Sequence, residues 1–71
     1  MKTRIRALRE DNDFTQEDIA RYLNMSQTGY SKYETGQSEI PVYILIRLAK
    51  FYNVSLDYIA GLTRSKERYR Y

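Results

Sequence analysis

Apolar residues recur along the chain at the three- and four-residue spacing of amphipathic helices rather than at the alternate spacing of strands. The pattern predicts five short helices, over roughly residues 2–10, 16–24, 27–35, 41–53 and 56–61. No run alternates like a half-buried strand, no unit of 20 to 50 residues repeats, and no low-complexity segment interrupts the chain. The predicted fold class is therefore all-α, in one compact domain.

Polar residues at the right positions mark several of the predicted helix starts. Thr15, followed by Asp18 three residues later, predicts a capping box before the second helix. Ser26 and Ser55 are the corresponding caps for the third and fifth helices. Each cap has apolar residues on both sides that can pack across it, which supports these boundaries.

The second and third predicted helices are joined by a very short connection. Only three residues separate Leu23 from Gln27, so the two helices must meet at a sharp angle. Gly36 suits the left-handed residue that ends the third helix. Pro41 fits the first position of the fourth helix, because its missing amide is harmless there.

The apolar stripes also predict which side of each helix faces the core. The inward candidates are Ile5, Leu8, Ile19, Ala20, Leu23, Tyr30, Tyr33, Leu45, Leu48, Ala49 and Tyr52. Glu34 lies on the same side of the third helix as its inward tyrosines. The opposite side of that helix carries only polar and cationic groups: Gln27, Thr28, Ser31 and Lys32.

Composition narrows the function classes. The 71 residues are 42% hydrophobic and 30% charged, which is typical of a globular domain. Without cysteine or histidine, the chain has no disulfide framework, no thiolate or imidazole zinc site and none of the commonest general base, so we expect no metal, no cofactor and no enzyme. It also contains no secretory signal and no apolar run that could span a membrane, so we expect a cytoplasmic protein.

The formal net charge of +3 is unevenly distributed. Residues 1–9 carry +4 and residues 64–71 carry +3, whereas the middle of the chain carries −4. A basic balance is compatible with nucleic acid or with an anionic membrane surface, although an ordinary solvated face also explains it.

Two short helices joined by a tight turn, the second with a polar outer face, define a helix-turn-helix. In this arrangement the chain, over about residues 3–62, resembles the Cro and phage-repressor type helix-turn-helix family of transcriptional regulators. The matching residues, in order, are Thr15, Gln16, Ala20, Ser26, Gln27, Tyr33, Glu34, Gly36, Pro41, Leu45, Ala49 and Val54. The resemblance implies a lambda-repressor-like DNA-binding domain over residues 1–62. The polar and cationic composition of residues 63–71 predicts a basic, flexible tail.

The resemblance further implies that the third helix reads the major groove of double-stranded DNA. Gln27 can make a bidentate contact to adenine, Thr28 can meet a thymine methyl, and Lys32 can reach guanine or a phosphate. Ser31 permits close approach to the groove. Gln16, Ser26 and Arg4 complete the predicted DNA contacts, with Gln16 and Arg4 on the phosphate backbone. The alternative is that these are ordinary solvated side chains.

Arg9 shares the apolar side of the first helix, and the family often pairs such an arginine with the glutamate that Glu34 matches. We therefore expect a structural ion pair between the first and third helices. The alternative is a surface pair between Arg9 and Asp13, four residues on, which would contribute little.

Two further features allow more than one interpretation. The eight tyrosines could form a stacking surface for single-stranded nucleic acid, but the helical spacing of most of them favours core and core-edge positions. Tyr43, Tyr69 and Tyr71 fit either role. Gly29 stands where the family commonly has a bulkier residue; it either lets the backbone approach the groove or is a neutral change in a tolerant first turn.

The number and kind of partners follow from the size of one reading helix. A single helix buries little surface, and family members usually bind a two-fold symmetric operator as dimers, so we expect a homodimer. Leu56, Tyr58 and Leu62 are the candidate dimer residues, although they could simply cover the core. The rival function is a helical protein-interaction module, such as an antitoxin, whose DNA surface is weak or unused.

Overall fold

The computed structural model describes residues 2–65, which fold into five helices without a strand. Their bounds are α1 Ile5–Asp11, α2 Gln16–Tyr22, α3 Gln27–Thr35, α4 Val42–Tyr52 and α5 Leu56–Ile59. The all-α fold class is confirmed. The last part of the predicted tail, residues 66–71, lies outside the described residues, as do Tyr69 and Tyr71.

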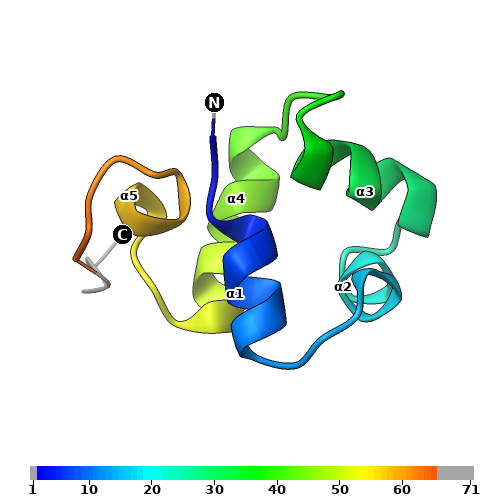
Figure 1. Ribbon diagram of the computed structural model, residues 1–71, viewed down its shortest axis with the longest axis horizontal. Helices are drawn as coiled ribbons and strands as arrows, with labels where there is room; N and C mark the ends of the chain where they lie inside the picture. Colours follow the sequence, from blue (N-terminus) through cyan, green and yellow to red (C-terminus); the bar gives the residue numbers. More distant parts are fainter. Residues whose placement is uncertain (1, 66–71) are drawn as a thin grey trace.

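The helices are arranged along the longest axis of the molecule (Figure 1). α1 and α4 lie at the centre, α5 lies at one end, and α2 and α3 lie at the other. The helix-turn-helix formed by α2 and α3 therefore stands apart from α5. Within residues 2–65, no helix combines the length and apolar character needed to cross a bilayer.

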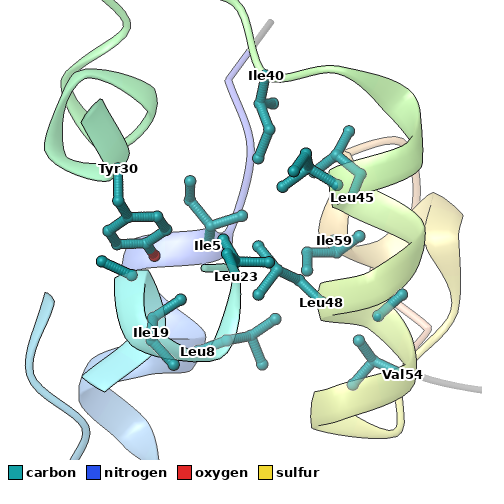
Figure 2. Packing of buried hydrophobic residues seen from close by; sticks show 13 residues of the cluster. Ile5, Leu8, Ile19, Leu23, Tyr30, Ile40, Leu45, Leu48, Val54 and Ile59 are labelled. Carbon is teal, nitrogen blue, oxygen red and sulfur yellow. The ribbon is translucent and has the colours of Figure 1, made fainter. Parts of the chain in front are cut away.

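One cluster of buried side chains joins all five helices (Figure 2). It contains the predicted Ile5, Leu8, Ile19, Leu23, Leu45 and Leu48, together with Ile40, Ile44, Val54 and Ile59. Tyr30 points from α3 into this cluster and is fully buried. Burying a large apolar side chain stabilises the fold by about 1.5 to 3 kcal/mol, so Tyr30 anchors α3 to the rest of the domain.

The predicted caps are present at three helix starts. Thr15 Oγ1 accepts from the Asp18 amide at 3.1 Å, and Asp18 Oδ2 accepts from the Thr15 amide at 2.9 Å, which completes the capping box. Ser26 Oγ accepts from the Gly29 amide at 3.1 Å, and Ser55 Oγ accepts from the Tyr58 amide at 2.9 Å. These side chains satisfy amides that a helix start leaves without partners.

The turn between α2 and α3 depends on a left-handed residue. Asn24 has φ 58°, and the Met25 amide that follows it donates to the Ala20 carbonyl at 2.9 Å. The side-chain amide and the carboxylate let Asn and Asp tolerate this conformation better than most residues. The same device ends α4 at Asn53, with φ 57°, whereas α3 ends at Gly36, with φ 82°.

Both predicted boundaries of α1 were wrong. α1 begins at Ile5 rather than Lys2, because the Arg4 amide donates to the Ile59 carbonyl at 2.8 Å and ties the preceding residues to α5. It also continues through Asp11, since the Asn12 side chain and amide both reach the Leu8 carbonyl and extend the last turn.

The start of α4 also differs from the prediction. Pro41 caps the helix instead of occupying its first position: its ψ of 148° is extended, and its carbonyl accepts the first hydrogen bonds. α5 is only four residues long, and the chain turns after it at Gly61, whose φ is 83°. A Cβ there would lie 2.5 Å from the Lys2 carbonyl oxygen, so only glycine permits this approach of the backbone at Lys2 and Gly61.

Candidate nucleic-acid interface

The outer side of α3 is open to solvent, as the sequence pattern predicts. Ser26, Gln27, Thr28 and Lys32 are exposed, and Ser31 is half-buried. Tyr30 on the inner side holds the helix against the core, so the polar side chains face away from the domain. The structure thus brings the predicted helix residues together on one surface.

All of these helix residues except Ser26 line an open hollow of about 380 Å³. Its walls are Gln16 from α2, the α3 residues Gln27, Thr28, Ser31 and Lys32, and Gln37 from the loop that follows α3. Amide, hydroxyl and ammonium groups are the donors and acceptors that contact base edges and phosphates in protein–DNA interfaces. We call these six residues the recognition surface.

Gln37 is the member of this surface that the sequence analysis missed. It follows Gly36, whose left-handed conformation ends α3 and reverses the chain. The Ser38 amide then donates to the Lys32 carbonyl at 3.1 Å and keeps the loop close to the end of the helix. The sequence did contain a signal for Gln37. It is a polar residue directly after the glycine that ends the helix, and a tight turn there brings the next residue back beside the helix.

The charge of the recognition surface is neutral to positive. Lys32 is its one ionised member, and Glu34, the single acid of α3, has a side chain that is only 2% exposed. Glu17 and Asp18 lie nearby in the first turn of α2 and are exposed. Of these two, Glu17 pairs with Arg21 at 3.1 Å, which partly offsets its charge.

Arg9 and Glu34, the two side chains expected to pair, form a two-pronged contact between α1 and α3. Arg9 Nε donates to Glu34 Oε2 at 2.7 Å, and Arg9 Nη2 donates to Oε1 at 3.1 Å. Arg9 Nη1 donates to the Phe14 carbonyl at 2.9 Å. The guanidinium therefore joins α1, the loop before α2, and α3, and this arrangement displaces the alternative surface pair with Asp13.

Burial and pairing act in opposite directions on these two groups. The hydrogen bond to Glu34 raises the pKa of Arg9 above its ordinary value. Burial alone would raise the pKa of Glu34, but its interactions with Arg9, the Tyr30 hydroxyl and Gln16 outweigh burial and lower that pKa. Both groups are therefore charged at neutral pH. Burial also raises the pKa of the neighbouring Tyr52 to about 12 and that of Tyr30 further still, so both phenols are neutral.

Gln16 lies between this ion pair and the recognition surface. Its side chain is half-buried, and Nε2 donates to Glu34 Oε1 at 3.1 Å. The same carboxylate oxygen thus accepts from both Arg9 and Gln16. One wall of the recognition surface is connected to the buried pair by this bond.

Arg4 lies at a different place from the other predicted DNA contacts. Its guanidinium stacks over the Tyr58 ring, 4.4 Å from the centroid, and Nη1 donates to the carbonyls of Tyr58 and Thr63. Arg4 thereby fastens the start of the chain to the segment around α5. Its predicted contact with a DNA phosphate stays a prediction.

The candidate dimer residues lie on and after α5. Leu56 and Tyr58 are half-buried and pack against the core, whereas Leu62 is 75% exposed. Of the three candidate dimer residues, Leu62 therefore has the largest exposed fraction.

Gly29 occupies a confined position in the first turn of α3. A Cβ there would lie 3.1 Å from Ser26 Oγ and 3.2 Å from Met25 Cε. Glycine therefore leaves room for the capping hydroxyl, a structural reason that neither of the two sequence interpretations included.

The tyrosines follow the predicted core role only in part. Tyr30 is buried, and Tyr33, Tyr52 and Tyr58 pack against the core. Tyr22 is instead 39% exposed and stacks on Phe51, with 4.5 Å between ring centroids. The Arg47 guanidinium also lies over this ring, 5.3 Å from its centroid.

Comparison with known proteins agrees with this geometry. A helix-turn-helix family model matches residues 5–59. The chain is 38% identical over 60 residues to the uncharacterized HTH-type transcriptional regulator YobD and 33% identical over 58 residues to the HTH-type transcriptional regulator ImmR, both of Bacillus subtilis. These matches cover 84% and 82% of the chain, and 54% and 46% of the two relatives.

A further relative is named as an antitoxin rather than as a transcriptional regulator. The chain is 33% identical over 57 residues to the antitoxin PezA of Streptococcus pneumoniae, a match that covers 80% of the chain and 36% of that protein. The chain spans about half the length, or less, of these relatives. No solved structure matches it significantly. The fold, the tight turn and these matches together show that the chain belongs to the Cro and phage-repressor type helix-turn-helix family of transcriptional regulators.

Proposed function

We propose that this chain is a sequence-specific regulator that binds double-stranded DNA, places α3 in the major groove and represses transcription in the cytoplasm. The observation that carries the proposal is the sorting of charge on α3. Its outer side presents amides, hydroxyls and Lys32, while its single acid, Glu34, is turned inward. An anionic groove favours such a surface.

The recognition surface divides into base-reading and backbone-positioning groups. Gln27, in the first turn of α3, suits the adenine edge, and Thr28 and Lys32 suit the thymine methyl and guanine acceptors. Gln16 and Gln37, the members that do not belong to α3, and the neighbouring Ser26 are assigned to phosphates, where they would position the protein. Arg4 lies apart from this surface, where its guanidinium is bonded around α5, and its contact with a phosphate would be made from there.

A homodimer on a two-fold symmetric operator fits the placement of the elements. α3 and α5 lie at opposite ends of the longest axis, which extends 30 Å (Figure 1). Pairing two copies at their α5 ends would direct both α3 helices outward. Half-sites lie about one helical turn, or roughly 34 Å, apart, so the two α3 helices of a dimer must not lie next to each other.

Selection followed by a salt titration tests the proposal. Duplexes bound by the full chain would be selected from a random-sequence pool and sequenced, and an inverted repeat is expected. The binding constant for the selected duplex should fall with salt by about 0.9 log units per log unit for each phosphate neutralised. An affinity no better than millimolar at low salt would exclude DNA reading.

The similarity to an antitoxin favours one second candidate. In that case the chain is a helical module that binds another protein, and its DNA surface is weak or unused. The titration separates the two functions, because a protein-binding module would show neither an enriched sequence nor a phosphate-dependent salt slope.

A further inference from the structure

The structure links the buried ion pair to the DNA-facing surface through one side chain. Gln16 contributes to the recognition surface and donates through Nε2 to Glu34 Oε1 at 3.1 Å. Glu34 is held in turn by two hydrogen bonds from Arg9, at 2.7 and 3.1 Å. A continuous chain of bonds therefore runs from α1 through α3 to the side chain at the start of α2.

The chemistry of this bond selects one orientation of the Gln16 amide. An ionised carboxylate only accepts hydrogen bonds, whereas an amide has a donating nitrogen and an accepting oxygen at nearly identical positions. The Gln16 nitrogen must therefore face Glu34, and the flipped orientation would bring two acceptors together. The carbonyl oxygen and the second N–H of Gln16 stay available to another partner.

Burial makes this selection effective. The Glu34 side chain is 2% exposed, so water competes little for its oxygens. Its lowered pKa keeps it ionised and acceptor-only at neutral pH. The entropy cost of ordering a long amide side chain is then met during folding rather than when DNA binds.

We propose that Glu34 is a positioning residue for DNA binding, which fixes the orientation of the Gln16 amide on the recognition surface and makes the contribution of Gln16 depend on the buried pair. The proposal rests on the proposed function and deepens it. It assigns to Glu34 a role beyond joining α1 to α3. Lys32, which lies on the same surface and has no bond to Glu34 among those described, supplies the matched control.

A double-mutant cycle on the selected duplex tests the proposal. The full-length variants Gln16→Ala, Glu34→Gln and the double variant would be compared, after circular dichroism shows that each is folded at the assay temperature. A second cycle would combine Lys32→Ala with Glu34→Gln. Glu34→Gln replaces the acceptor-only group with an amide that can bond Gln16 in either orientation.

The expected result is a coupling of about threefold or more in the dissociation constant between Gln16→Ala and Glu34→Gln. Lys32→Ala should show additive effects with Glu34→Gln, because Lys32 has no described bond to Glu34. If Glu34→Gln merely destabilised the fold, it would instead be coupled to Gln16→Ala and Lys32→Ala alike, and the proposal would be overturned. Additive effects in both cycles would overturn the proposal while leaving DNA binding intact. Failure of the unmodified chain to bind any duplex would overturn the proposed function and this inference with it.

A measurement on the unmodified chain decides the matter if Glu34→Gln does not fold. In the nuclear magnetic resonance spectrum, the side-chain amide protons of Gln16 should exchange with solvent more slowly than those of the exposed Gln27 and Gln37. Glu34 accepts one of these protons, so a Gln16 amide that exchanges as fast as the other two would contradict the positioning role.

Discussion

Gln27 is the residue whose position most directly ties local structure to sequence readout. It is the first residue of α3, directly after the Ser26 cap, and its side chain is exposed. A glutamine amide there can donate to adenine N7 and accept from N6 at once. Gln27→Ala should therefore weaken binding by about 1 to 3 kcal/mol at its preferred base and relax selectivity there.

Competition between the selected duplex and variants at each base pair would measure this effect. Gln16→Ala is the comparison: its side chain is assigned to the phosphate backbone, so its loss should weaken binding to all duplexes alike. Equal losses on every duplex for Gln27→Ala would remove Gln27 from the base-reading set.

Glu34 makes the stability of the domain depend on acid pH. Its pKa lies below the ordinary 4.5, because its interactions with Arg9, Tyr30 and Gln16 outweigh burial. The unfolded chain thus binds a proton at higher pH than the native one does. The stabilisation is present above about pH 4.5 and is lost as the pH falls through the lowered native value.

Urea unfolding at pH 7 and pH 3 measures the contribution of Glu34 to the free energy of unfolding. Glu34→Gln should lose less unfolding free energy between the two pH values than the unmodified chain, because its amide does not titrate. Glu17→Gln, at an exposed pair, should leave the difference nearly unchanged. An identical pH dependence for Glu34→Gln and the unmodified chain would show that Glu34 does not titrate as the structure indicates.

Removing Arg9 tests the same pair from the other side. Arg9→Met would leave the Glu34 carboxylate buried without its cation and should cost about 3 to 5 kcal/mol in unfolding free energy at pH 7. Arg9→Lys keeps the charge but not the planar fork, so its cost should be smaller. A loss under 1 kcal/mol for Arg9→Met, measured by urea unfolding, would mean that water screens the pair.

At the scale of elements, the turn from α2 to α3 sets the angle of the recognition helix. Asn24 holds the left-handed conformation at φ 58° that lets the Met25 amide reach back to the Ala20 carbonyl. Alanine has the same Cβ as asparagine but lacks the polar side chain that compensates for this conformation, whose penalty is about 1 to 2 kcal/mol. Asn24→Ala should lower the melting temperature by several degrees.

Asn24→Gly is the matched control, because glycine adopts this conformation without a Cβ clash. It should retain nearly the stability of the unmodified chain in the same thermal unfolding measurement. If alanine and glycine proved equally stable, the left-handed backbone would not be the source of the preference for asparagine.

Helix starts could be predicted from the sequence more closely than helix ends or tertiary links. The caps Thr15, Ser26 and Ser55 could be predicted because a capping residue and the amide it satisfies are close in sequence. The start of α1 could not be read in this way, since the Arg4 amide is satisfied by Ile59, far along the chain.

The same distinction applies to the interface. The exposed side of α3 follows from helical periodicity, so its candidate residues could be named in advance. The bond from Gln16 to Glu34 depends on how α2 packs beside α3, and the place of Gln37 depends on how the chain turns after Gly36. The position of Arg4 could not be predicted, because nothing in the sequence around it indicates which distant carbonyls its guanidinium contacts.

For the whole molecule, the separation of α3 from α5 allows binding and assembly to be altered independently. Leu62 is 75% exposed, so Leu62→Asp should leave the free energy of unfolding of the isolated monomer almost unchanged. If the α5 ends pair, a buried carboxylate there would weaken the dimer. Affinity for a two-half-site duplex should then fall towards that for a single half-site.

Sedimentation and binding to both duplexes measure the two consequences of Leu62→Asp together. Val42→Asp, at a 57% exposed apolar position on α4, is the control for added negative charge and should leave the oligomeric state unchanged. The sharpest contradiction would be a Leu62→Asp protein that still sediments as a dimer. In that case another surface joins the two copies, and the outward placement of both α3 helices would need a different two-fold axis.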